Sequence, residues 1–131
     1  PTPAERLETA RQLQARGWRV RIRIDPMIVR YDYSKVIAEV RELRPERVTL
    51  GALRAEANLD RYVGDGLFAD LEPTADPKAM RRYALATRLG LYRPAVEALG
   101  ELCSVGLCEE TKEAWEALGL KTEAKSCNCG A

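Results

Sequence analysis

The chain has 131 residues, of which 46% are hydrophobic and 31% are charged, and its formal net charge is +1. These totals indicate one globular domain with no overall electric field to draw it onto nucleic acid or a membrane surface. The sequence contains no histidine, which excludes histidine acid–base catalysis and histidine metal ligands from this chain. Because no secretory signal or transmembrane run is visible, we expect a cytoplasmic protein that makes no membrane contact.

The first predicted elements are a helix and a strand. Thr2 and Glu5 form a capping pattern for a helix that Gly17 ends. From Trp18 to Ile24 apolar residues alternate with arginines, which predicts a strand, and Pro26 is expected to end it.

A second helix and strand follow the same order. The helix is predicted from residue 34 to 43 and the strand from 47 to 53, with Gly51 inside it. A glycine within a strand often marks the close approach of another group. Strands separated by helices of this length predict an α/β fold with parallel strands.

The second half of the chain is predicted to be more helical. We expect one compact domain in which residues 1–63 form the β/α units and residues 64–131 form a helical region with a cysteine-rich tail. The expected elements are a short helix at 55–63, a surface loop at 64–77, helices at 78–90, 94–99 and 110–118, and a weak third strand at 102–108.

A first candidate site lies where the predicted strands end. Arg23 and Asp25 share one face of their strand, and Arg54 follows the next strand, so all three fall at the edge where parallel β/α proteins bind ligands. Arginines there need anionic partners or water, because an unpaired buried charge is costly. The alternative is an exposed sheet face with solvated arginines.

A second candidate site is the stretch from residue 78 to 93, which has five basic residues and no acidic ones. Arg82, Tyr83, Arg88 and Tyr92 are the residue types that neutralise phosphates and stack on bases. The alternative is a solvated helix face that pairs with acidic residues elsewhere.

The cysteines form a third candidate site. Cys108, Cys127 and Cys129 are candidate ligands for zinc or for an iron–sulfur cluster, although their spacing is not that of a standard zinc ribbon. Cys103 lies an odd number of residues before Cys108, so on a strand it would face the other way, as a small buried hydrophobe. The alternative is four unligated thiols.

Several of these runs together resemble the radical S-adenosylmethionine (SAM) proteins of the spore photoproduct lyase type. They span nearly the whole chain, and their conjunction carries the resemblance. The matching runs are Arg6 and Leu7 with Ala10 and Gly17, Arg23 to Ile28, Arg47 to Arg54, Met80 to Tyr83 with Arg88 and Gly90 to Tyr92, and Leu107 to Thr111 with Trp115, Gly119, Leu120 and Cys127 to Cys129.

The resemblance implies the C-terminal part of a partial (β/α) TIM-like barrel with parallel strands. It implies SAM binding at Arg23, Asp25 and Arg54, and it implies a DNA substrate for a 5′-deoxyadenosyl radical. The nucleic-acid side would then be formed by Arg82, Tyr83, Arg88 and Tyr92.

The sequence departs from that family in the spacing of residues 80–92 and, above all, in its cysteines. It has no Cys-x3-Cys-x2-Cys, the motif that holds the catalytic [4Fe-4S] cluster. The expected partner is therefore an N-terminal half-barrel that carries this motif. The chain alone is expected to be inactive and to self-associate through an open strand edge.

Two other classes of protein fit the same sequence. The first is a non-catalytic α/β binding module, with a metal held by cysteines and a basic helix for an anionic partner. The second is a structural α/β domain with no site of its own.

Overall fold

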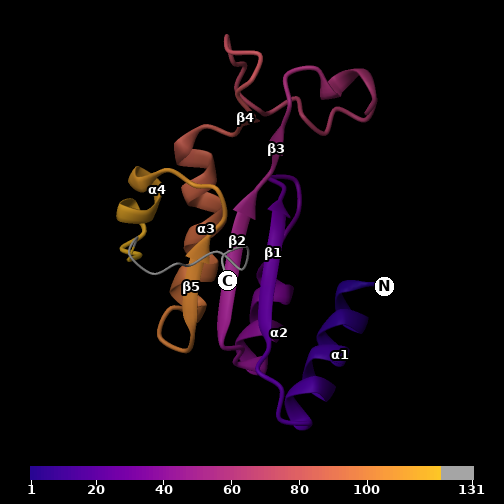
Figure 1. The fold of residues 1–131 in the computed structure, drawn as a ribbon, viewed down its shortest axis with the longest axis vertical. Helices are drawn as coiled ribbons and strands as arrows, with labels where there is room; N and C mark the ends of the chain where they lie inside the picture. Colours follow the sequence, from indigo (N-terminus) through magenta and orange to yellow (C-terminus); the bar gives the residue numbers. More distant parts are fainter. Residues whose placement is uncertain (122–131) are drawn as a thin grey trace.

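A computed structural model describes residues 1–121 of the chain as an α/β fold. Figure 1 shows its elements along the chain. They are α1 (Pro3–Ala15), β1 (Arg21–Met27), α2 (Ser34–Leu43), β2 (Arg47–Ala52), β3 (Arg54–Ala55), the 3-10 helix η1 (Leu59–Arg61), β4 (Arg81–Arg82), α3 (Leu85–Leu99), β5 (Ser104–Leu107) and α4 (Lys112–Ala117).

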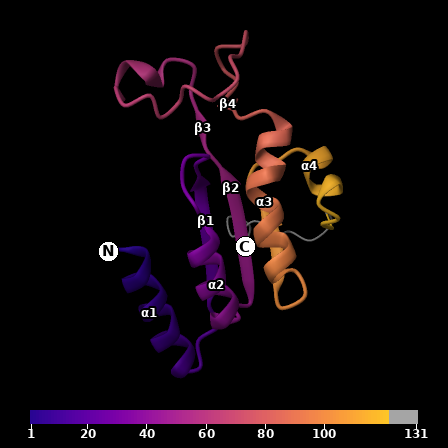
Figure 2. The same ribbon diagram turned by 180° about the vertical axis from the view of Figure 1, so that it is seen from behind.

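The main sheet has three parallel strands in the order β1-β2-β5. Figures 1 and 2 show α2 and α3 against one face of this sheet, with α1 beside α2 and α4 beside α3. The parallel strands and the helices between them confirm the α/β fold that the sequence predicts.

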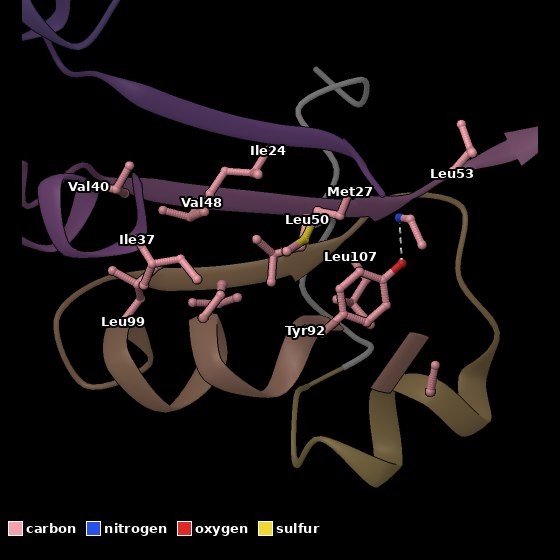
Figure 3. Packing of buried hydrophobic residues seen from close by; sticks show 14 of the residues in the cluster. Ile24, Met27, Ile37, Val40, Val48, Leu50, Leu53, Tyr92, Leu99 and Leu107 are labelled. Carbon is pink, nitrogen blue, oxygen red and sulfur yellow. Dashed lines mark hydrogen bonds between the residues drawn. The ribbon is translucent and has the colours of Figure 1, made fainter. Parts of the chain in front are cut away.

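The hydrophobic core lies between the sheet and these helices. The sheet contributes buried side chains from alternate strand positions, and α2 and α3 contribute one apolar stripe each (Figure 3). Val48 and Leu50 on the central strand are fully buried, because β2 has a strand on each side and helices above it. The main contributors are Ile24, Val48, Leu50, Leu107, Ile37, Val40, Tyr92 and Leu99.

The opposite face of the sheet carries polar and small residues. Arg23, Thr49 and Gly106 are register partners across the three strands, so they share this face. The hydroxyl of Thr49 is fully buried and has no hydrogen-bond partner within the described residues. The two faces of the sheet therefore differ sharply in character.

A small antiparallel pair extends from the carboxyl end of β2. β3 follows β2 after one residue and pairs with β4, and this pairing places Arg54 opposite Arg82. The segment between the two strands, residues 56–80, contains η1 and two buried side chains, Phe68 and Leu71.

The start and the end of β1 differ from the predicted strand. The N–H groups of Gly17 and Trp18 bond to the carbonyls of Gln14 and Leu13, which ends α1 and leaves Trp18 exposed outside the strand. Pro26 lies inside β1 rather than ending it. The ladder to β2 shifts register between Ile24 and Met27, and a proline without an N–H is tolerated at such an irregularity.

The predicted helices at 55–63 and 78–90 were wrong in extent. The first is a single turn, Leu59–Arg61, and residues 81–82 form β4. α3 begins only at Leu85, and it then continues through Pro94 to Leu99 as one helix. Its buried residues lie on both sides of Pro94, so packing keeps the helix continuous.

Two shorter predictions are confirmed, namely the third strand, observed as β5, and the last helix, observed as α4. Among residues 1–121, no helix combines the length and apolar character that crossing a membrane requires.

Candidate functional site

Arg23, Asp25 and Arg54 meet at the carboxyl ends of β1 and β2. The Asp25 Oδ2 atom accepts hydrogen bonds from Arg23 Nη2 at 2.7 Å and from Arg23 Nε at 3.0 Å. Arg54 Nη2 lies 3.7 Å from the same oxygen, and the Asp25 side chain is only 10% exposed. The structure thus brings together the three residues that the sequence predicted at this edge.

Gly51 provides the space for this arrangement. A Cβ atom added to Gly51 would lie 2.5 Å from Asp25 Cγ, well inside van der Waals contact. The carboxyl group of Asp25 therefore rests directly on the backbone of β2. This confirms the expectation that the glycine inside this strand marks a close approach.

Cys108 completes the group, which we call the strand-end cluster (Arg23, Asp25, Arg54 and Cys108). Arg23 Nη2 lies 2.7 Å from Cys108 Sγ, and Arg54 Nη1 donates to the Cys108 carbonyl at 3.1 Å. The thiol is buried beside the Arg23 guanidinium group. The sequence suggested metal binding for this cysteine and gave no sign of its contact with Arg23.

Of the three predicted metal ligands, Cys108 alone lies within the described residues. Cys127 and Cys129 lie outside the described residues. Within residues 1–121, no group of three or more cysteines and acidic residues is placed to hold a metal ion. Cys103 is half-buried, packs against the core and lies 3.6 Å from the Leu99 carbonyl, and burial raises the pKa of its thiol.

A second charged group, an ion pair with buried side chains, joins α3 to the turn between β5 and α4. The Glu110 side chain is 2% exposed, and its Oε1 atom lies 3.0 Å from Arg88 Nε. Tyr92 donates its hydroxyl proton to the same Oε1 at 2.7 Å. The Tyr92 hydroxyl also accepts from the Ala52 N–H at 2.7 Å (Figure 3). Desolvation and the neighbouring Glu110 carboxylate raise the pKa of Tyr92 far above its ordinary value.

Most of the residues that the sequence suggested for nucleic-acid binding make contacts inside the fold instead. Tyr83 and Tyr92 are 1% and 0% exposed, and Arg88 is 5% exposed. Arg88 Nη1 donates to the Tyr83 carbonyl, and the Tyr83 hydroxyl accepts from the Val29 N–H at 3.4 Å. The fold thus uses these three side chains internally, and Arg82, with 28% of its side chain exposed, is the most accessible of the four.

Glu109 and Glu110 were not among the candidate site residues from the sequence, in which Glu110 only begins a predicted helix. Glu109 has a left-handed backbone with φ of 49°. Arg54 Nη1 donates to the carbonyl of Cys108 at 3.1 Å, and Arg82 Nη1 donates to that of Glu109 at 3.3 Å. The paired strands β3 and β4 therefore hold the β5–α4 turn with two arginines.

Comparison of this chain with protein-family profiles, curated proteins and solved structures found no match.

Proposed function

We propose that this chain is the C-terminal half of a partial β/α barrel in a radical SAM enzyme similar to the spore photoproduct lyases. The observation that carries the proposal is the strand-end cluster. It lies at the carboxyl ends of parallel strands, where β/α proteins bind their ligands, and the helices α2 and α3 cover the other face of the sheet.

The chemistry of the cluster suits the amino-acid end of SAM. A guanidinium group binds a carboxylate through two parallel hydrogen bonds, so Arg23 and Arg54 match the carboxylate of the cofactor. The Asp25 carboxylate matches its ammonium group or a ribose hydroxyl. Arg54 Nε also lies 3.3 Å from Glu109 Oε2, and the Glu109 side chain is 68% exposed. Glu109 can therefore move away and leave one edge of Arg54 to a ligand.

Bound next to a [4Fe-4S] cluster, SAM would supply a 5′-deoxyadenosyl radical to the substrate. The cluster ligands must come from another segment, because Cys-x3-Cys-x2-Cys does not occur in this sequence. The residues of this chain would hold and orient the cofactor and close one side of the cavity. With a DNA substrate, contact with phosphates would fall to Arg82, since the other three candidates are buried.

The first test is the coding sequence directly upstream of Pro1. A continuous reading frame that carries Cys-x3-Cys-x2-Cys is the expected result. A frame without that motif would remove the radical SAM function.

The second test uses the intact polypeptide, reconstituted with iron and sulfide, and measures binding of SAM and its cleavage to 5′-deoxyadenosine. Asp25→Asn should weaken SAM binding by about tenfold or more. Asp65→Asn is the control, because Asp65 also pairs with an arginine, Arg30 at 3.3 Å, but on the exposed surface. Equal binding by both variants would exclude Asp25 from the cofactor site.

The alternative, a binding module with a basic helix, has weaker support. Residues 81–82 form a strand rather than a helix, and Arg88 faces the buried Glu110. Metal analysis of the purified chain addresses the cysteine part of that alternative. One zinc ion per chain, bound by Cys108, Cys127 and Cys129, would favour it.

A further inference from the structure

We propose that the surface at the amino ends of β1 and β2 binds single-stranded nucleic acid, with one base stacked on Trp18 and a phosphate held by Arg44. This surface lies at the end of the sheet opposite the strand-end cluster (Figure 1). None of its residues belongs to that cluster, so this binding does not depend on SAM chemistry.

The charges of the chain are divided between its two ends. Residues 11–21 and 41–47 contain seven arginines and two glutamates. These segments include the last turns of α1 and α2 and the starts of β1 and β2, and Figure 1 shows them together at one end of the molecule, which we call the basic end. Residues 56–80, at the other end, contain six acidic and two basic residues. The net charge of +1 therefore conceals one end that attracts polyanions and another that repels them.

Trp18 supplies an aromatic surface at the basic end. It is 67% exposed, whereas the other tryptophan, Trp115, is 8% exposed. The N–H groups of Gly17 and Trp18 bond to the carbonyls of Gln14 and Leu13, so the backbone of Trp18 is fixed against the end of α1. A largely exposed tryptophan on a fixed backbone can stack on any unpaired base, because every base has a flat aromatic face.

Arg44 lies at the same place. Arg44 and Trp18 line one hollow of about 390 Å³, a volume within the range of small-ligand pockets. Arg44 has a left-handed backbone with φ of 50°, a conformation that a residue with a Cβ rarely adopts. An arginine at a position that favours glycine indicates a use for its side chain. That side chain is exposed and pairs with no acidic side chain of residues 1–121, so it can accept a phosphate.

Neighbouring arginines extend the positive charge beyond this hollow. Arg19 Nη1 and Arg21 Nε both lie 2.8 Å from Glu46 oxygens, so two guanidinium groups share one carboxylate. Arg16, like Arg44, is exposed and has no acidic partner among the described residues. The charge of the basic end therefore exceeds what one phosphate requires, and it favours a strand of several nucleotides over a single nucleotide.

Binding of a labelled oligodeoxythymidylate of about ten nucleotides to the full chain is the test, measured by fluorescence anisotropy. We expect the oligonucleotide to bind and to quench the tryptophan fluorescence, because a base stacked on Trp18 contacts the one largely exposed indole of the described residues. A duplex of the same length should bind more weakly and quench little, since its bases are already stacked on one another.

Two matched pairs of variants locate the contact. Trp18→Ala should weaken binding by about tenfold, whereas Tyr62→Ala, at another exposed aromatic residue, should leave it unchanged. Arg44→Ala should weaken binding by about threefold and reduce the slope of log affinity against log salt by about 0.7, as expected for one phosphate contact. Arg61→Ala removes an equal charge from an exposed position at the acidic end and should do neither. Circular dichroism checks that all four variants fold, and the quenching of the unmodified chain does not depend on them.

Three results would overturn the proposed binding: no association, equal affinity for single strand and duplex without quenching, or an equal loss of affinity in Arg44→Ala and Arg61→Ala. A fourth is association with oligoglutamate as tight as with the oligonucleotide, which would indicate a surface for acidic proteins instead. None of these measurements involves SAM or an upstream reading frame, so they leave the test of the strand-end cluster separate.

Discussion

Asp25 depends on both a charge environment and a precise steric fit. Its carboxyl group lies between Arg23 and Arg54 and is 10% exposed, so removing either partner leaves a charge with little access to water. The side chain can take this position only because residue 51 has no Cβ. The strand-end cluster therefore depends on the glycine in β2 as much as on the charged residues in β1.

Gly51→Ala tests this steric requirement. The added methyl group would push Asp25 away from the arginines, and the free energy of unfolding should fall by about 1–3 kcal/mol. Urea denaturation measures the change. Gly64→Ala is the control, because a Cβ there meets no atom within 4 Å. A variant as stable as the control would mean that Asp25 does not rest on the strand.

Tyr92 should limit the stability of the fold at alkaline pH. Desolvation and Glu110 raise its pKa in the folded protein above the ordinary value of 10.0. Below that value both states keep the phenol proton. As the pH rises above it, the unfolded chain loses the proton while the folded chain retains it, so the free energy of unfolding falls.

Tyr92→Phe separates this effect from simple loss of stability. At neutral pH the variant should be less stable by about 1–3 kcal/mol, because the Ala52 N–H and Glu110 lose a buried partner. Above pH 10 its stability should decline less steeply than that of the unmodified protein. Urea titrations across this range measure both. Tyr62→Phe, at an 81% exposed position, should keep the original slope, and equal slopes for all three proteins would contradict the prediction.

At the scale of the elements, helix α2 ends in an unfavourable backbone conformation. α2 ends at Arg44, whose φ of 50° and ψ of 59° are left-handed, a conformation that costs a residue with a Cβ about 1–2 kcal/mol. Arg44→Gly should therefore raise the free energy of unfolding by about 1 kcal/mol. Arg44→Ala keeps the Cβ and should give no gain, so equal stabilisation by both variants would show that the side chain, not the backbone, matters. Thermal denaturation distinguishes them.

Local sequence patterns were sufficient to predict the strands of the main sheet and the first helix. The alternation before Asp25 and the capping pattern at Thr2 both correspond to observed elements, because each signal lies within its own segment. β4 carries no such signal. It is two residues long and exists through its pairing with β3, more than twenty residues earlier, so a local pattern could not distinguish it from a helix.

The candidate site could likewise be predicted only in part from the sequence. Arg23, Asp25 and Arg54 could be placed together because parallel strands end at a common edge. The burial of Arg88 could not be foreseen, because its partner Glu110 comes from a different element and both belong to segments that look solvated. A count of charges along the chain does not show which charges the fold will pair.

At the scale of the whole molecule, one face of the described sheet is covered, and its β1 edge is open. Helices cover the apolar face, while β1 pairs with β2 alone among the described strands and borders a cavity of about 470 Å³ between α1, β1 and α2. When no strand is supplied, other copies of the chain are the available extended partners. The isolated chain should therefore self-associate in a concentration-dependent way.

Sedimentation velocity over a range of chain concentrations tests this expectation. We expect a shift from monomer to larger species. The shift should be reduced in Val36→Lys but retained in Val96→Lys, because both valines are half-buried on helices but only Val36 lines the cavity beside β1. A chain that stays monomeric at every concentration would indicate that the β1 edge is protected within the chain itself, and it would count against an open half-barrel.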